Sequence, residues 1–332
     1  MITPGLLAIL ALCALALVIG SCVRWWMLWR GDRGVGAGDP ARQVAHQAVQ
    51  RRLSSLRVWW LLLILFSAAL ATGIPGLSLL FCTASLIGLH EFHSIFVQRK
   101  PSSVMLLWLL CILSMVHFGL LLWLEPPKLL LSTTGMLFLI TVGNQLYVGN
   151  TADYLRTTGG YIWAGLVLIV GMSCGVALTS LPISTHRWNA GVVGWTLFVV
   201  LLTETSDIAQ ALIGRQFGRH AIIRRVSPGK TWEGLAGGVV VTSLLALFLS
   251  APLTNLFEGR SLAAGAVLSL LSGVVICLAG FLGDINISAA KREAGLKDSS
   301  QLFPGMGGML DRLDSLTFTA PALYGYAQAW NS

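Results

Sequence analysis

The sequence predicts an all-α integral membrane protein, a polytopic bundle of about nine or ten transmembrane helices. The first observation is composition, because 55% of the 332 residues are hydrophobic and only 11% are charged. Soluble domains usually carry about 25% charged residues. The second observation is that the apolar residues form runs of roughly 20, which is the length of a helix that crosses a bilayer. The alternating ten-residue segments of a membrane β-barrel are missing from the sequence.

Residues 1–57 are predicted to form an N-terminal transmembrane helix followed by a basic cytoplasmic linker. The apolar run 4–23 lacks the positive start of a signal peptide, so we expect a retained helix. The segment 24–57 is rich in arginine, which predicts a cytoplasmic position for it and an outer position for the N-terminus. Within this segment, residues 41–57 fit an amphipathic surface helix and a solvated linker equally well.

Residues 58–332 are predicted to form one polytopic membrane domain. Its apolar runs lie near residues 58–73, 74–97, 102–124, 129–147, 160–181, 189–213, 232–252, 263–283 and 315–328. Their alternation places both long polar stretches, 203–234 and 284–315, on the cytoplasmic face of a bacterial inner membrane. The formal net charge of +8 comes from bases in the loops. This distribution fits the positive-inside rule, so no nucleic-acid partner is expected.

Cysteine and histidine motifs do not indicate a zinc site. All six cysteines lie in apolar runs, and none forms a CxxC pair, so they are expected to be small buried hydrophobic residues. The sequence His-Glu-Phe-His at residues 90–93 lacks the HExxH spacing. We expect this segment to lie at the membrane interface.

The first polar stretch, 203–234, combines acids within an apolar helix with a basic loop. An aspartate in the middle of a membrane helix costs about 2.5–3.5 kcal/mol, so Glu204 and Asp207 are expected to face a cavity or a partner. Residues 227–231 read Ser-Pro-Gly-Lys-Thr, which predicts a loop that opens into a helix and binds phosphate, with Lys230 reaching an anionic oxygen. A Walker A motif is excluded, because Arg224 occupies the position of its first glycine.

The second polar stretch, 284–315, is dense in acids, bases and glycines. Asp284 is expected at the end of a span, while Asp311 and Asp314 share one face at the start of the last helix. Asp284 and Asp311 could therefore hold a divalent cation between them. Hard oxygen ligands suit Mg²⁺, which usually keeps phosphate oxygens or water in its other positions.

Basic side chains and glycines in the same stretch indicate an anion beside that cation. Ser288, Lys291 and Arg292 stand at helical spacings i, i+3 and i+4 and are expected to face one anion. The segment 304–308, Pro-Gly-Met-Gly-Gly, lets the backbone approach a ligand closely. The alternative is a polar cytoplasmic tail with internal salt bridges. We predict phosphoryl or nucleotidyl transfer at a membrane surface.

The two stretches together resemble the phosphatidate cytidylyltransferase family, also called CDP-diacylglycerol synthases. That family's pattern runs S-x-x-K-R, K-D, P-G-H-G-G and D-R-x-D. The matching positions are Ser288, Lys291, Arg292, Lys297, Asp298, Pro304, Gly305, Gly307, Gly308, Asp311, Arg312 and Asp314. The upstream positions that match are Asp207, Gln210, Gly214, Arg215, Phe217, Gly218 and the run from Ser227 to Gly234.

The resemblance implies that CTP and phosphatidate react to give CDP-diacylglycerol and pyrophosphate, for phospholipid synthesis. It implies Mg²⁺, in a metal centre that also admits K⁺, with Asp284 and Asp311 as metal ligands. The residues it implies for catalysis are Asp284, Asp311, Asp314, Lys291 and Lys297. The residues it implies for substrate binding are Asp207, Arg215, Ser227, Lys230, Thr231, Ser288, Arg292 and Arg312. Membrane lipids are the other expected partners, and a homodimer is left open.

Met306 departs from the family pattern, which has histidine there. Methionine cannot carry a proton or bind Mg²⁺. If that histidine acts as a general acid, its loss would cost about 10²–10⁴-fold in rate. Two alternatives therefore stay open: transfer to a different lipid phosphate or isoprenoid lipid, and a catalytically weak relative that binds anionic lipid and nucleotide.

Overall fold

A computed structural model describes residues 3–31, 40–96, 101–149, 151, 154–303 and 306–331. Its helices are α1 (Pro4–Gly31), α2 (Pro40–Thr72), α3 (Ile74–Phe96), α4 (Pro101–Leu120), α5 (Pro126–Val148), α6 (Tyr154–Gly165), α7 (Met172–Ala177), α8 (Gly194–Phe217), α9 (Trp232–Leu253), α10 (Leu262–Glu293), α11 (Leu310–Leu313) and α12 (Leu316–Asn331). A π-helical segment, η1 (Leu166–Gly171), joins α6 to α7, and short 3₁₀ turns occupy η2 (Leu178–Ser180) and η3 (Gly191–Val193). Two short strands, β1 (Ala221–Ile223) and β2 (Ser227–Thr231), pair antiparallel.

The prediction of an all-α polytopic membrane protein is confirmed. Eight helical stretches in the described part of the chain are long and apolar enough to cross a membrane. The apolar part of α2, Leu56–Thr72, is shorter, and α12 has 16 residues. All six cysteines are unpaired.

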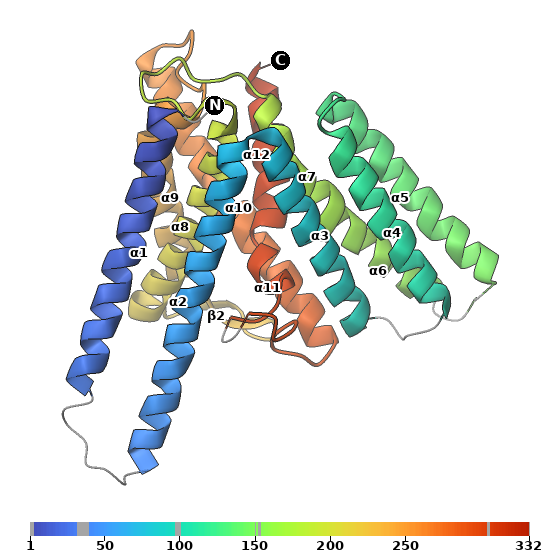
Figure 1. Ribbon diagram of the computed structural model, residues 1–332, viewed down its shortest axis with the longest axis horizontal. Coiled ribbons are helices and arrows are strands. Elements are labelled where there is room, and N and C mark those ends of the chain that lie inside the picture. The colour runs from blue at the N-terminus through green and yellow to red at the C-terminus, as the bar shows by residue number, and fades with distance from the viewer. Residues whose placement is uncertain are drawn as a thin grey trace.

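The helices α8, α9, α10 and α12 pack against one another and form the centre of the bundle (Figure 1). α3 and α7 extend this centre on one side, and the α4–α5 hairpin lies beyond them. Small residues permit the close packing. A Cβ on Gly273 of α10 would lie 2.4 Å from the backbone Cα of Ser243 in α9. Close contact between backbones stabilises membrane helices, because lipid tails leave little hydrophobic force to drive helices together.

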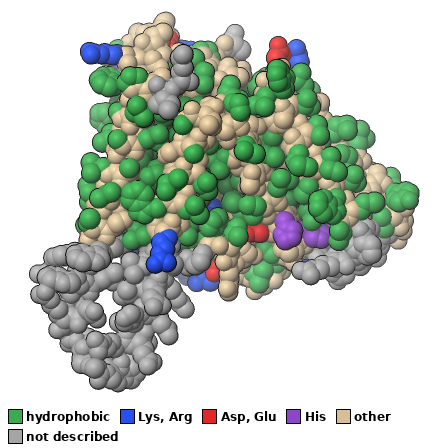
Figure 2. Space-filling model, in the orientation of Figure 1, with side chains coloured by type: hydrophobic (Ala, Val, Ile, Leu, Met, Phe, Trp, Pro, Cys, Tyr) green, Lys and Arg blue, Asp and Glu red, His purple; other side chains and the backbone are tan. Residues whose placement is uncertain are grey.

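The polar stretches gather at one end of this bundle. Figure 1 shows β2 and α11 at the same end, although they are far apart in the chain. On the face drawn in Figure 2, hydrophobic side chains cover the body of the molecule, and the coloured acids and bases lie near its two ends. The distribution is the one expected for a protein whose body contacts lipid and whose ends contact water.

The helix that carries Asp284 is longer than predicted. We expected the span to end at residue 283, but α10 continues to Glu293. Gly295, which follows the C-cap residue Ala294, has a φ of +71° and terminates the helix: the N–H of Leu296 donates to Lys291 O, and the N–H of Gly295 donates to Arg292 O. These two bonds form a Schellman motif, which satisfies the last carbonyls of the helix. Asp284 therefore lies within a helix, more than two turns before its end.

Two other segments differ from the expected form. α2 runs without a break from Pro40 to Thr72, so the predicted boundary at residue 57 falls inside a helix. Residues 227–231 form strand β2 and not a loop, because β1 pairs with them. Thr231 then caps α9, since its hydroxyl accepts a hydrogen bond from the N–H of Gly234 at 3.1 Å.

Candidate active site

A half-buried ion pair joins the hairpin to α10. Lys230 Nζ lies 2.7 Å from Asp284 Oδ2, and the two side chains are 17% and 21% exposed. Ser288, one turn further along α10, donates to Asp284 Oδ1 at 3.2 Å. Burial lowers the pKa of Lys230, but the carboxylates of Asp284 and Asp207 outweigh burial and raise it above the usual lysine value. Lys230 is therefore a protonated cation at the end of the bundle.

A second, more deeply buried pair joins α10 to α11. Lys291 Nζ lies 2.5 Å from Asp311 Oδ1, with the two side chains 11% and 7% exposed. Asp311 Oδ2 accepts hydrogen bonds from Ser299 N, Ser299 Oγ and Gly308 N at 2.8–2.9 Å. Burial alone would raise the pKa of Asp311, but these donors lower it below the usual value. Asp311 is thus an anion whose two oxygens are both occupied.

The glycines of the second stretch contact these carboxylates. Gly307 has a φ of +86°, and a Cβ there would lie 2.4 Å from Asp311 Oδ2. A Cβ on Gly308 would lie 2.5 Å from Glu91 Oε1. The two glycines therefore leave room for the protein's own carboxylates, and the close approach of this backbone to a ligand stays a prediction. Pro304 and Gly305, which belong to the same predicted turn, lie outside the described residues.

A third cluster lies between α8, α10 and the start of α12. It brings Glu204 and Asp207 of α8 within electrostatic range of Arg312. Within the described ranges, Asp207 Oδ1 and Arg312 Nε are buried and have no hydrogen-bond partner. Buried polar atoms nearly always have a partner, so such atoms point to a missing ligand, ion or water.

Asp314 joins this cluster because α10 carries a glycine beside it. A Cβ on Gly283 would lie 2.3 Å from Asp314 O, so a side chain at position 283 would push this carbonyl away. Burial raises the pKa of Asp314 well above the usual value, and the negative charges of Asp284 and Asp207 raise it further. Asp314 and its neighbours form a site where added positive charge would be stabilised.

Other predicted site residues are not brought together. Ser288 contacts Asp284 and Lys291 contacts Asp311, whereas Arg292 donates to the carbonyls of Val226 and Leu296. The three side chains therefore do not share one anion in this arrangement. Three further predicted residues take other places: Arg215 and Lys297 are exposed, and Ser227 lies half-buried in β2.

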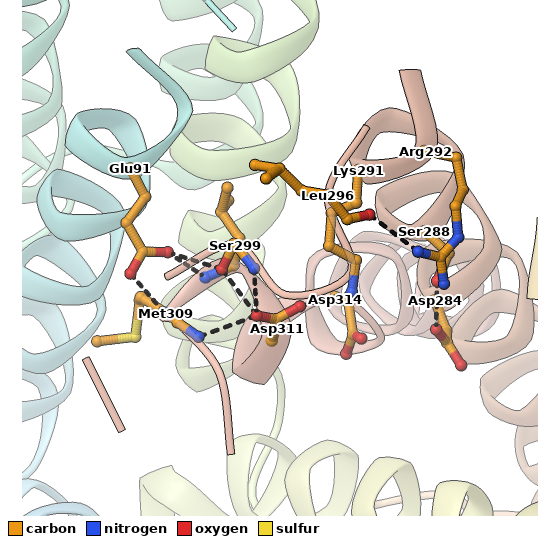
Figure 3. A network of polar contacts seen from close by, with 12 residues as sticks. Glu91, Asp284, Ser288, Lys291, Arg292, Leu296, Ser299, Met309, Asp311 and Asp314 are labelled. Atoms are coloured by element: carbon orange, nitrogen blue, oxygen red, sulfur yellow. Dashed lines mark hydrogen bonds and ion pairs between the residues drawn. The ribbon is translucent and has the colours of Figure 1, made fainter. Parts of the chain in front are cut away.

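One residue with a central place in the site was not predicted. Glu91, near the end of α3, is only 6% exposed and accepts hydrogen bonds from the backbone N–H groups of Met309 and Leu310 (Figure 3). In the sequence, Glu91 stood out only as part of His-Glu-Phe-His, which lacks the spacing of a zinc motif. A buried charge near the end of an apolar helix was the available signal.

The carboxylates of the site are of the ligand type that magnesium prefers. They offer hard oxygen atoms, and the buried Asp207 Oδ1 lacks a partner. Among the residues that the structure describes, no group of three histidine, cysteine or acidic side chains forms a complete cation site. Magnesium commonly takes only one or two carboxylates and fills its other positions with water and phosphate oxygens. The site is therefore consistent with a cation that arrives with a phosphate.

Comparison with known proteins gives one family and several relatives. The model described as "Cytidylyltransferase family" matches residues 54–330. The chain is 33% identical to the protein YnbB of Escherichia coli K12, described as uncharacterized, over 93% of each chain. It is 41% identical to the phosphatidate cytidylyltransferase of Haemophilus influenzae, over 38% of this chain and 42% of that protein. It is 38% identical to the enzyme of that name from Pseudomonas aeruginosa, over 42% of this chain and 50% of that protein. The chain thus aligns with half or less of each of these two transferases.

Proposed function

Since this chain belongs to the cytidylyltransferase family, we propose that it transfers the cytidylyl group of CTP to phosphatidate. A phosphate oxygen of the lipid attacks the α-phosphorus of CTP, and the bond from that phosphorus to the bridging oxygen of the β-phosphate breaks. The products are CDP-diacylglycerol and pyrophosphate. The attacking lipid oxygen and the departing pyrophosphate lie on opposite sides of the α-phosphorus. The main tasks of the protein are therefore to position the two substrates and to neutralise the negative charge of their phosphates.

The observation that carries the proposal is the presence of two lysine–aspartate pairs at one end of a membrane bundle. Lys230 pairs with Asp284, and Lys291 pairs with Asp311. Each pair is electrically neutral. On nucleotide binding the partners would be exchanged: the lysines would bind phosphate oxygens, and the aspartates would hold the magnesium ion. The exchange avoids leaving a buried charge without a partner, which would cost several kcal/mol.

Asp284 and Asp311 are the proposed magnesium ligands, with Asp314 beside them. The ion would neutralise negative charge on the phosphates during transfer. Asp311 can serve only after Lys291 turns toward a phosphate, because Lys291 occupies its Oδ1 atom. Lys230, Lys291 and Arg312 are the proposed phosphate-binding cations. Potassium as a second cation stays an expectation from the family resemblance.

The position of the site suits one soluble and one lipid substrate. The two ion pairs lie toward one end of the bundle, so a lipid phosphate in the headgroup layer and a nucleotide in water could both reach them. We propose that this end of the bundle faces the cytoplasm of a bacterial inner membrane, since nucleotides are found there.

A different lipid phosphate is the second candidate acceptor. The named transferases match half or less of their own length, and the relative that matches along 93% of the chain carries no assigned reaction. Met306 also replaces the histidine of the family pattern. Mass spectrometry of the lipid product would distinguish phosphatidate from another lipid phosphate.

The test is pyrophosphate release by the purified full chain supplied with CTP, phosphatidate and Mg²⁺. We expect turnover that stops when EDTA removes the metal. We expect Asp284→Asn to lower kcat/KM by about a hundredfold or more, because it removes one charge from the site. Glu125→Gln is the control, since Glu125 is exposed in the α4–α5 loop and pairs only with Lys128. Equal turnover in Asp284→Asn and the parent, or no turnover in folded protein that binds CTP, would contradict the proposal.

A further inference from the structure

The carboxylate of Glu91 faces four hydrogen-bond donors of the second polar stretch, 284–315. No other described residue outside 203–315 has a carboxylate with this many donors from that stretch. Glu91 Oε1 accepts from Ser300 Oγ at 2.7 Å and from Met309 N at 2.9 Å. Its Oε2 accepts from Leu310 N at 2.9 Å and lies 3.2 Å from Ser299 Oγ, whose single hydroxyl proton it shares with Asp311 Oδ2. Glu91 lies in α3, more than 200 residues before these donors. The contact therefore joins two distant parts of the chain.

The four donors to Glu91 are all neutral. No lysine or arginine pairs with it within the described ranges, although the residue is only 6% exposed. Buried carboxylates need such bonds, because a buried charge without partners is costly. Two of the donors are backbone N–H groups at the entry to α11. If Glu91 is removed, these groups lose their partners and the segment that contains them is free to move.

Glu91 is connected to the Lys291–Asp311 pair through Ser299. The hydroxyl of Ser299 lies between the two carboxylates, 3.2 Å from Glu91 Oε2 and 2.8 Å from Asp311 Oδ2 (Figure 3). Gly308 fits against both Glu91 and Ser299, and a Cβ there would lie within 2.6 Å of either. The position of Asp311 thus depends on a segment held on one side by α3 and on the other by α10.

We propose that Glu91 is a positioning residue, which anchors residues 299–303 and 306–310 and thereby fixes Asp311 against Lys291. The role in turnover rests on the proposed function. Glu91 does not contact the reacting atoms in this proposal. It acts through Asp311, and also through Arg312 and Asp314, which follow the anchored segment directly in the chain.

The first experiment measures anchoring without relying on activity. In Glu91→Gln, an amide NH₂ replaces one oxygen, so whichever way the amide turns, one backbone N–H, of Met309 or of Leu310, loses its acceptor and one serine hydroxyl must turn to accept instead of donate. We expect faster hydrogen exchange at residues 299–310 and at least threefold faster labelling of Lys291 by an amine-reactive reagent. Lys230 is the internal reference, because it pairs with Asp284 and has no bond to the anchored segment. Faster labelling of both lysines would indicate general loosening and would overturn the proposal, as would parent-like exchange at 299–310.

The second experiment asks whether anchoring serves turnover. A displacement of about 1 Å at a reacting group can cost 10²-fold, so we expect Glu91→Gln to lower kcat by ten- to a hundredfold while the KM for CTP changes less. A purely stabilising role would lower the amount of folded protein and leave kcat per folded molecule unchanged. That result would overturn the proposal.

Glu258→Gln is the matched control. Glu258 also orders a loop by accepting bonds from a backbone N–H and a hydroxyl, both of Thr185, but it follows the end of α9 opposite to the end that adjoins β2. We expect this variant to keep parent kcat and parent labelling of Lys291. If the parent itself releases no pyrophosphate, the proposed function fails, and the exchange and labelling results still decide whether Glu91 anchors the segment.

Discussion

The charged residues of the second polar stretch divide by what their side chains contact. Lys291 and Asp311 are buried and paired, and Asp311 has further bonds to Ser299 and Gly308. Arg156 and Glu293 form a pair of the same charge type that is 74% and 65% exposed. Exposed pairs contribute little to stability, because water and salt screen them. Buried pairs are costly to break, because the remaining partner keeps its charge in a poorly solvating place.

This contrast predicts the effect of removing one lysine. Lys291→Met should lower the free energy of unfolding by about 3–5 kcal/mol, since Asp311 would stay buried without its cation. Arg156→Met should change the same quantity by less than about 1 kcal/mol. Denaturant unfolding in a mild detergent, followed by tryptophan fluorescence, measures both. A similar decrease in the free energy of unfolding for the two variants would show that the buried pair stabilises the protein no more than the exposed pair does.

At the scale of elements, the site depends on how closely α10 approaches the start of α12. Gly283 lies one residue before Asp284 and directly faces the carbonyl of Asp314. A glycine inside a helix usually costs about 1 kcal/mol relative to alanine. Here the glycine allows the backbone at Asp314, in the turn between α11 and α12, to pack directly against α10, which a larger residue would prevent.

Gly283→Ala should therefore impair turnover although alanine favours helices. The new Cβ would lie 2.3 Å from Asp314 O, so the backbone must shift, and overpacking of this kind costs about 1–3 kcal/mol. We expect a loss of about tenfold or more in kcat together with a lower melting temperature. Gly135→Ala in α5 is the control, because its Cβ would meet no atom within 4 Å. A parent-like kcat in Gly283→Ala would contradict the importance of this contact.

At the scale of the whole molecule, both polar stretches lie at one end of a bundle of apolar helices (Figure 1). Membrane helices that alternate in direction place every second connection on the same side. The hairpin before α9 and the segment after α10 are separated by two spans, so they meet at one end. The opposite end carries the connection between η2 and η3, which includes Arg187.

The proposed cytoplasmic orientation can be tested with two exposed positions. Arg224 lies in the turn of the hairpin at the site end, and Arg187 lies at the opposite end; both are exposed. In intact spheroplasts, an impermeant thiol reagent should label Arg187→Cys and leave Arg224→Cys unlabelled. In inverted vesicles the pattern should reverse. The parent protein corrects for its six native cysteines. The opposite pattern would place the site outside the cytoplasm.

The class of structure, and most of the polar residues that gather at the site, could be predicted from the sequence. Apolar runs of membrane-spanning length require helices, because only helices satisfy their own backbone in lipid. The ordered motifs from Asp207 to Thr231 and from Asp284 to Asp314 indicated the family that the comparison found. Both inferences depend on local pattern, which a single chain displays without its fold.

Which side chains meet could not be predicted without the fold. Lys230 pairs with Asp284, and Lys291 pairs with Asp311, although the sequence predicted the aspartates as metal ligands and the lysines as anion ligands. The role of Glu91 depends on a contact across more than 200 residues. Such contacts depend on how helices pack, and helix packing is set by side chains from several spans at once. No local sequence pattern contains that information, so the contribution of α3 to the site could be seen only in the folded structure.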